Sequence, residues 1–279
     1  DFPSADGRLP LCARDYAGDG PALLLMHGLT RNSADFEGLA EHLAGRYRLV
    51  VPDQRGRGRS EWDPDPARYA VDRYCADMLG LIQRLELDRP ILLGTSMGGL
   101  MAIVMGSLAP QSYRAIVLND VGPEVEAEGL ARIAGYVGRT VKVADWTAAA
   151  DYCRTINGSA FAQYGEQEWL SFARRIFAPA PDGGLTLAYD PAIAVPFSAP
   201  QSPPPDLWPL WRQLAGVPML VIRGELSDLL TAQTVAKMQD AHRDLQLCTV
   251  PGVGHAPMLD EPEAIAAIDR LLAGLAPHE

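Results

Sequence analysis

One stretch, residues 91–100, constrains the fold more than any other part of the chain. An apolar run, Ile91 to Leu93, leads into Gly94-Thr95-Ser96-Met97-Gly98, and a helix-compatible run extends from Leu100 to Leu108. A G-x-S-x-G pattern between a strand and a helix is typical of a sharp turn that holds the serine hydroxyl above a sheet. The serine backbone in such a turn is strained, and a Cβ two positions before or after it would collide with neighbouring chain. We therefore predict that sterics require both glycines and that the turn presents the hydroxyl of Ser96.

Further apolar runs alternate with amphipathic helix patterns along most of the chain. A continuous apolar run is typical of a strand buried on both faces of a parallel sheet. The alternation predicts a doubly wound, mostly parallel sheet, in which active residues gather at the carboxyl ends of the strands. The predicted strands cover residues 21–26, 47–51, 91–93, 115–118, 217–222 and 245–250.

The alternation breaks after Asp120, where a helical pattern without a convincing strand takes over and ends in a proline-dense stretch, 196–209. We predict a core domain formed by residues 1–123 and 213–279, with a helical cap and its proline-rich return linker inserted at 124–212. The inserted segment is rich in aromatic residues, most of which must pack within the cap. The others would line an apolar pocket above the turn. The candidates for the pocket are Trp146, Trp169, Phe172 and Trp208.

Composition narrows the classes of partner. The chain has 279 residues, of which 48% are hydrophobic, so it can bury a large core. A net charge of −11 disfavours nucleic acid and anionic membrane surfaces as partners. Four widely spaced cysteines form no C-x-x-C pair, so we expect free thiols and no metal site. No apolar run reaches 18 residues and the first residues do not resemble a signal peptide, so the expected location is the cytoplasm. The oligomeric state is left open.

A serine hydroxyl is a poor nucleophile and needs a neighbouring base to accept its proton. The favoured base is His255, which follows the last predicted strand in a glycine-rich loop. The base in turn needs a carboxylate that fixes its tautomer. We favour Asp228, which follows the strand that precedes the histidine strand and gives the order nucleophile, acid, base that accompanies this turn. Asp120, at the end of another strand on the same edge, is kept as the alternative.

A developing oxyanion on the substrate requires backbone N–H donors. Two donors are expected at the start of the two segments that approach the serine. One is the N–H of Met97, at the first turn of the helix, and the other is the N–H of Leu29, just after His27-Gly28.

Taken together, five ordered motifs resemble those of the α/β-hydrolase superfamily, in particular its small capped esterases and C–C hydrolases. The resemblance implies an eight-stranded sheet, a Ser-His-Asp triad, a structural role for the arginine-glycine loop, a small-molecule substrate and no cofactor. Serine in the turn, where dehalogenases and epoxide hydrolases of this fold have aspartate, implies acyl transfer. The motifs are Met26-His27-Gly28, residues 52–60 (PDQRGRGRS), residues 94–99 (GTSMGG), residues 224–228 (GELSD) and Gly252-Val253-Gly254-His255.

The favoured hypothesis is therefore a hydrolase of carboxylic esters or lactones with a small, largely apolar substrate and an acyl-enzyme intermediate. A second hypothesis keeps the triad but cleaves a carbon–carbon bond in a vinylogous diketone derived from aromatic breakdown. A third, of another class, is a hydrolase fold that serves as a non-catalytic ligand receptor. The presence of every candidate triad residue counts against the third hypothesis.

Overall fold

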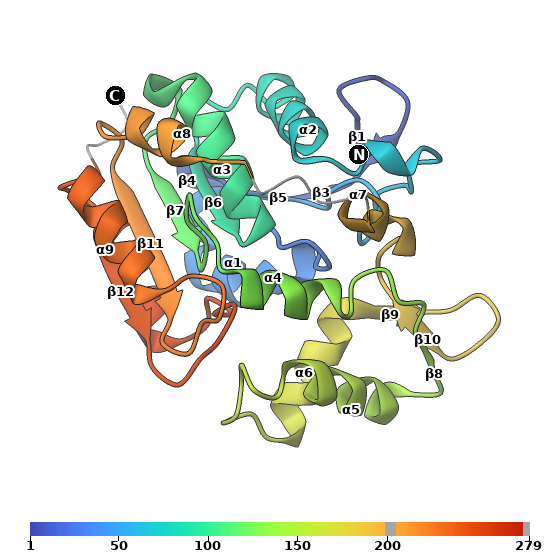
Figure 1. Cartoon of the computed structure of the whole chain (residues 1–279). Coiled ribbons are helices and arrows are strands. Elements are labelled where there is room, and N and C mark those ends of the chain that lie inside the picture. The colour runs from blue at the N-terminus through green and yellow to red at the C-terminus, as the bar shows by residue number, and fades with distance from the viewer. Residues whose placement is uncertain (199–204, 276–279) are drawn as a thin grey trace.

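The protein is built around a seven-stranded sheet with the strand order β12-β11-β7-β6-β4-β5-β3 (Figure 1). A computed structural model describes residues 1–198 and 205–275. All neighbouring strands of this sheet run parallel except β3, which is antiparallel to β5. The strands are β3 Ala13–Tyr16, β4 Gly18–Met26, β5 Gly45–Pro52, β6 Ile91–Thr95, β7 Ile116–Asn119, β11 Met219–Gly224 and β12 Gln246–Val250.

Burial on both faces explains why these runs form strands at the centre of the sheet. The side chains of Leu23 to Met26, Ile91 to Leu93 and Ile116 to Leu118 are at most 1% exposed. Continuous apolar sequence is what a parallel sheet covered on both faces requires. The predicted doubly wound, mostly parallel sheet is confirmed. The implied eighth strand is wrong for the described residues, because the N-terminal pair β1 Phe2–Pro3 and β2 Pro10–Leu11 forms a separate two-stranded sheet.

Helices cover both faces of the sheet. On one face α2, α3 and α8 pack against one another, and Trp211 of α8 contacts His242 at the end of α9 (Figure 1). On the other face α1 and α10 are joined by a hydrogen bond between His42 Nε2 and Asp269 Oδ2. The helices are α1 Glu37–Leu43, α2 Val71–Arg84, α3 Met97–Leu108, α8 Trp208–Gln213, α9 Ala232–Ala241 and α10 Pro262–Gly274, with 3₁₀ turns η1 Ser33–Phe36, η2 Pro66–Arg68 and η3 Pro110–Ser112.

Between β7 and α8 the chain forms a cap, whose helices α5 and α6 lie beyond the carboxyl ends of the strands (Figure 1). The helices of this cap are accompanied by a small three-stranded antiparallel sheet, β8-β10-β9, for which the sequence offered no convincing strand pattern. Strands of two or three residues are too short to show alternation in a sequence. The cap elements are α4 Ala127–Ala134, β8 Lys142–Val143, α5 Trp146–Asn157, α6 Glu166–Ile176, β9 Phe177–Pro179, β10 Leu185–Leu187, η4 Pro191–Ala194 and α7 Val195–Ser198.

The predicted domain boundaries, a core of residues 1–123 and 213–279 with a cap of residues 124–212, stay a prediction. Helix α8 falls inside the predicted cap segment, yet it packs on α3 of the core and its Trp211 is completely buried. Within the predicted return linker, residues 199–204 lie outside the described residues. No helix in the described part of the chain is long and apolar enough to cross a membrane.

Candidate active site

Ser96 occupies the turn between β6 and α3 in a conformation that few residues adopt. Its φ is +52° and its ψ is −116°. A Cβ on Gly94 would overlap the carbonyl of Gly98, and a Cβ on Gly98 would overlap the carbonyl of Met26. Both glycines are therefore required sterically, as the sequence predicted, because the strand, the turn and the helix approach one another at these two positions. The strained turn places the serine hydroxyl at the carboxyl edge of the sheet.

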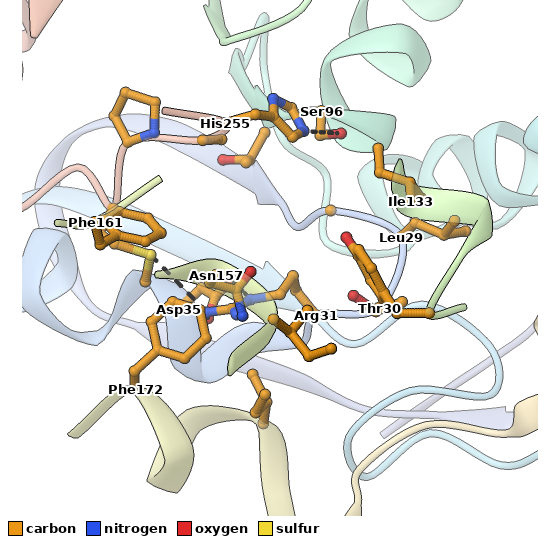
Figure 2. Close-up of a pocket in the computed structure, with 18 of the residues that line it drawn as sticks. Leu29, Thr30, Arg31, Asp35, Ser96, Ile133, Asn157, Phe161, Phe172 and His255 are labelled. Carbon is orange, nitrogen blue, oxygen red and sulfur yellow. Dashed lines mark hydrogen bonds and ion pairs between the residues drawn. The ribbon is translucent and has the colours of Figure 1, made fainter. Parts of the chain in front are cut away.

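The imidazole of His255 links this serine to a carboxylate. His255 Nε2 lies 2.9 Å from Ser96 Oγ (Figure 2). On the other side of the ring, Nδ1 lies 2.8 Å from Asp120 Oδ2. Because a carboxylate only accepts, Nδ1 carries the proton and Nε2 is left to accept from the serine hydroxyl. The side chain of His255 is 8% exposed and that of Asp120 is completely buried. The three groups form a line along which a proton can pass from the hydroxyl to the imidazole.

Asp120 is held in place by two further hydrogen bonds. Its Oδ1 accepts the backbone N–H of Gly224 at 2.9 Å, and its Oδ2 also accepts the hydroxyl of Ser227 at 2.6 Å. All three partners donate to the carboxylate, so the network fits the ionised form. The backbone of Asp120 has a φ of +56°, which directs its side chain back over the sheet from the end of β7.

Asp228, the acid that the sequence favoured, is not the carboxylate bound to His255. Its two oxygens accept from Arg132 of α4, at 2.5 Å from Nε and 2.8 Å from Nη2. The hydrogen bonds from Arg132 lower the pKa of Asp228 below its ordinary value. In the loop after β11 it is Ser227 that turns toward the site, while the next residue faces the cap. The prediction is wrong in this respect, and the alternative that was kept, Asp120, occupies the position.

The two predicted oxyanion donors, the N–H groups of Leu29 and Met97, belong to segments that adjoin the serine. Gly28 lies against Ser96, with 3.7 Å between the serine Cβ and the position of an added Cβ on Gly28. Neither the N–H of Leu29, which follows that glycine, nor the N–H of Met97 donates to another group in the described part of the chain. The carbonyl of Leu29 accepts from Nε of the buried Arg57 at 2.9 Å, which anchors this turn.

His27 supports the same turn from beneath. Its Nδ1 donates to the Gly28 carbonyl at 2.7 Å, and its Nε2 accepts the backbone N–H of Gln54 at 3.0 Å. Complete burial lowers the pKa of His27 to about 4, so the ring is neutral at pH 7 and keeps both bonds. Its role is to position the turn that carries Leu29.

A cavity of about 100 Å³ opens between the serine and the cap. Of the four aromatic candidates, Phe172 lines it and the other three lie elsewhere. Trp169 packs within the aromatic cluster of the cap, Trp146 lies under the guanidinium of Arg174, and Trp208 donates from Nε1 to Glu124. The tryptophans therefore stabilise the cap and its attachment to the core.

Sequence reasoning missed the polar part of this cavity. Figure 2 shows Ser96 and His255 on one side of it and Arg31, Asp35 and Asn157 on the other. Arg31 and Asp35 are four residues apart and form a bidentate ion pair with both N–O distances at 2.6 Å. Spacing of i and i+4 is the only signal of this pair in the sequence, and it is equally typical of an exposed helix face. Across the described residues, no group of three His, Cys, Asp or Glu side chains could hold a metal ion.

Comparison with known proteins agrees with this geometry. The profile of the alpha/beta hydrolase family matches residues 23–268. The chain is 39% identical to a 3-hydroxybutyrate-oligomer hydrolase from Cupriavidus necator, over 90% of this chain and 88% of the relative. It is 32% identical to a 2-(acetamidomethylene)succinate hydrolase from Mesorhizobium japonicum, over 89% and 86%. The crystal structure of an alpha/beta hydrolase from Novosphingobium aromaticivorans superposes with a TM-score of 0.93 at 44% identity, covering 98% of this chain and 96% of the other. The chain therefore belongs to the alpha/beta hydrolase family.

Proposed function

We propose that the protein hydrolyses carboxylic esters of small molecules through an acyl-enzyme on Ser96. The observation that carries this proposal is the hydrogen-bonded line from Ser96 through His255 to Asp120, with distances of 2.9 and 2.8 Å. Asp120 replaces Asp228 as the proposed acid, because it is the carboxylate that His255 contacts.

In the first half of the reaction His255 Nε2 takes the hydroxyl proton while Ser96 Oγ attacks the carbonyl carbon. The imidazolium that forms is stabilised by the buried carboxylate of Asp120. The negative charge on the carbonyl oxygen is accepted by the N–H groups of Leu29 and Met97, which have no other acceptor in the described structure. His255 then donates its proton to the departing alcohol, which leaves the acyl group on Ser96.

In the second half a water molecule replaces the alcohol. His255 accepts a proton from this water, whose oxygen attacks the acyl carbon, and the same two N–H groups stabilise the second oxyanion. Return of the proton to Ser96 Oγ releases the carboxylic acid and restores the resting state. Each step uses only groups of this chain, the ester and water.

A fluorophosphonate tests the proposal because it traps an activated serine by forming a covalent phosphonyl ester. We expect one label per chain, on Ser96, and none on a Ser96→Ala variant. Ser107→Ala is the matched control, because Ser107 lies in the last turn of α3 and its hydroxyl donates to the Val104 carbonyl. Labelling of another residue, or of none, would contradict the proposal and favour a non-catalytic receptor.

Cleavage of a carbon–carbon bond remains the second candidate, because the cavity holds Arg31, Asp35 and Asn157 in addition to its apolar lining. Such polar groups can direct the protonation of a diketone. The relative from Mesorhizobium japonicum is also named for a compound that is not an ester. Turnover of a series of p-nitrophenyl esters, compared with turnover of a vinylogous diketone from ring fission, separates the two reactions.

The substrates named for the two curated relatives share one chemical feature. A 3-hydroxybutyrate oligomer and a substituted succinate both carry a carboxylate. We therefore include esters of hydroxy acids with a free carboxyl end among the substrates to be tested.

A further inference from the structure

The wall of the cavity that faces the Ser96–His255 pair carries a guanidinium with unused donors. Arg31 gives Nε and Nη2 to Asp35, and its Nη2 also lies 3.9 Å from the sulfur of Met258. Its Nη1 has no partner among residues 1–198 and 205–275. The guanidinium lies over the ring of Phe172, 4.2 Å from the centroid, and the side chain retains 16% exposure, as a lining group of the cavity. Two N–H bonds of a fixed cation therefore remain available to a ligand in the cavity.

We propose that Nη1 of Arg31 binds a carboxylate of the substrate, so that the preferred substrates are esters that also carry a free carboxylate. This inference rests on the proposed ester hydrolysis at Ser96 and adds the chemical class of the substrate. The ester carbonyl lies at Ser96, and the anionic end reaches across the cavity to Arg31 (Figure 2).

The surroundings of Arg31 suit this role better than a purely structural one. Asp35 fixes the guanidinium through two bonds and Phe172 supports its face, so little side-chain freedom is lost when a ligand binds. Burying an ion pair is expensive and is often no more stabilising than apolar packing of the same volume. A pair placed in a cavity otherwise lined by side chains such as Phe161, Ile176 and Leu187 is therefore best explained by recognition of a polar ligand group.

Charge balance also points to Arg31 as the anion-binding group. The chain carries a net charge of −11, so an anionic substrate needs a local cation near the reaction centre. Arg132 approaches from the cap, but both oxygens of Asp228 occupy its Nε and Nη2, and it does not line the cavity. Arg31 does line the cavity; burial opposes its charged form, but the negative charge of Asp35 and the hydrogen bonds to it outweigh that effect and raise the pKa of Arg31, so it is charged at neutral pH.

The test compares two ligands that differ only in the charged end. The linear dimer of 3-hydroxybutyrate and the methyl ester of that dimer share the same internal ester bond, and only the first carries a carboxylate. Because the terminal methyl ester is a second ester bond, the rate is taken from the products of the internal bond alone, which are 3-hydroxybutyrate from the acid and methyl 3-hydroxybutyrate from the methyl ester. We expect the wild-type protein to cleave the acid with a kcat/KM about tenfold or more above that of the methyl ester, as one charge-assisted hydrogen bond provides. The difference should appear mainly in KM, because the carboxylate is bound equally before and during the reaction.

The variant removes both members of the ion pair, because Arg31→Gln alone would leave the carboxylate of Asp35 buried without a partner. In Arg31→Gln/Asp35→Asn the ratio of kcat/KM for acid over methyl ester should fall to about one. Arg154→Gln/Asp151→Asn is the matched control. It removes an arginine–aspartate pair from the exposed face of α5 and should keep the wild-type ratio.

Binding to a Ser96→Ala variant, measured by calorimetry, separates this inference from the proposed function and does not depend on the folding of the double variant. Tighter binding of the acid than of the methyl ester would support the carboxylate site even if no ester were hydrolysed. Equal binding of the two ligands, or a ratio of kcat/KM that the Arg31/Asp35 variant leaves unchanged, would overturn it.

Discussion

Replacement of Asp120 by asparagine should abolish most of the activity by reversing the tautomer of His255. The carboxylate accepts the Gly224 N–H at Oδ1 and both the Ser227 hydroxyl and His255 Nδ1 at Oδ2. If the NH₂ of the asparagine took the place of Oδ1, two donors, this NH₂ and the Gly224 N–H, would face each other. The amide oxygen will therefore accept from Gly224, and the NH₂ will occupy the place of Oδ2. There it donates to the imidazole, which forces the proton onto Nε2. His255 in that form cannot accept a proton from Ser96.

The expected loss follows from this change of tautomer and from the missing negative charge. In the asparagine variant, free energy is first required to bring the imidazole into the productive tautomer. The imidazolium then forms without the buried carboxylate that lies 2.8 Å from Nδ1 in the wild-type protein. In triads of this geometry the combined effect is on the order of 10⁴ in kcat, which corresponds to about 5 kcal/mol in the activation free energy. KM should change little, because the Asp120 side chain is buried behind the imidazole.

Asp228→Asn provides the matched control, since it makes the same substitution on the acid that the sequence favoured. It weakens the contact with Arg132, whose side chain is 26% exposed, so we expect kcat within about threefold of wild type and a loss of stability of about 1 kcal/mol or less. Both variants are assayed for kcat and KM with a p-nitrophenyl ester after their far-UV circular dichroism is shown to match that of wild type. Loss of activity in Asp228→Asn comparable to that in Asp120→Asn, or normal activity in Asp120→Asn, would refute the assignment.

Two further predictions concern the framework of the site. His27 titrates near pH 4 when folded and near 6.5 when unfolded, so the unfolded chain binds the extra proton first and stability decreases as the pH falls between these values. Protonation of His27 should lower the free energy of unfolding by about 3 kcal/mol from pH 7 to pH 4. In His27→Gln the plot of unfolding free energy against pH, measured by urea titration, should have a shallower slope. Identical slopes in the two proteins would exclude His27 as the cause. Gly98→Ala should lower the free energy of unfolding by at least about 2 kcal/mol because its methyl group overlaps the Met26 carbonyl, whereas Gly80→Ala, in α2 with open space around it, should raise it by about 0.5–1 kcal/mol. Equal effects of the two alanines in denaturant unfolding would contradict the steric argument.

The core and two of the three residues in the hydrogen-bonded line, Ser96 and His255, could be predicted because local sequence determines them. Buried strands of a parallel sheet have continuous apolar sequence, and Ser96 directly follows such a strand, β6. His255 lies in a glycine-rich loop after the edge strand β12, most of whose residues are exposed. Their approach in space follows from the rule that the carboxyl ends of parallel strands share one edge. No contact between distant side chains was needed for these predictions.

The acid and the pocket could not be predicted in the same way, because contacts between distant segments decide them. Asp120 and Asp228 each follow a strand that ends at the correct edge, and both give the chain order nucleophile, acid, base; Asp228 was favoured because it follows the strand that precedes the histidine strand. What separates them is Arg132, which lies 96 residues before Asp228 in the chain and binds both of its carboxylate oxygens. Likewise, the aromatic content of the cap does not reveal which rings face the cavity, since each ring fits a position inside the cap equally well.

The place of Asp120 in the sheet explains why it suits the acid role better than Asp228 does. Thr95 and Asn119 are register partners on the adjacent strands β6 and β7, so the residues that follow them, Ser96 and Asp120, lie at the same level of the sheet. Both of these residues have a positive φ. The backbone of Asp120 is further bonded to β11, since its N–H donates to the Ile222 carbonyl at 2.8 Å. An acid fixed between β7 and β11 is held by the core sheet itself. Asp228, one strand further away, is instead bonded to the cap through Arg132, so its position depends on the cap, whereas the hydrogen bonds that Asp120 makes to Gly224, Ser227 and His255 all lie within the core.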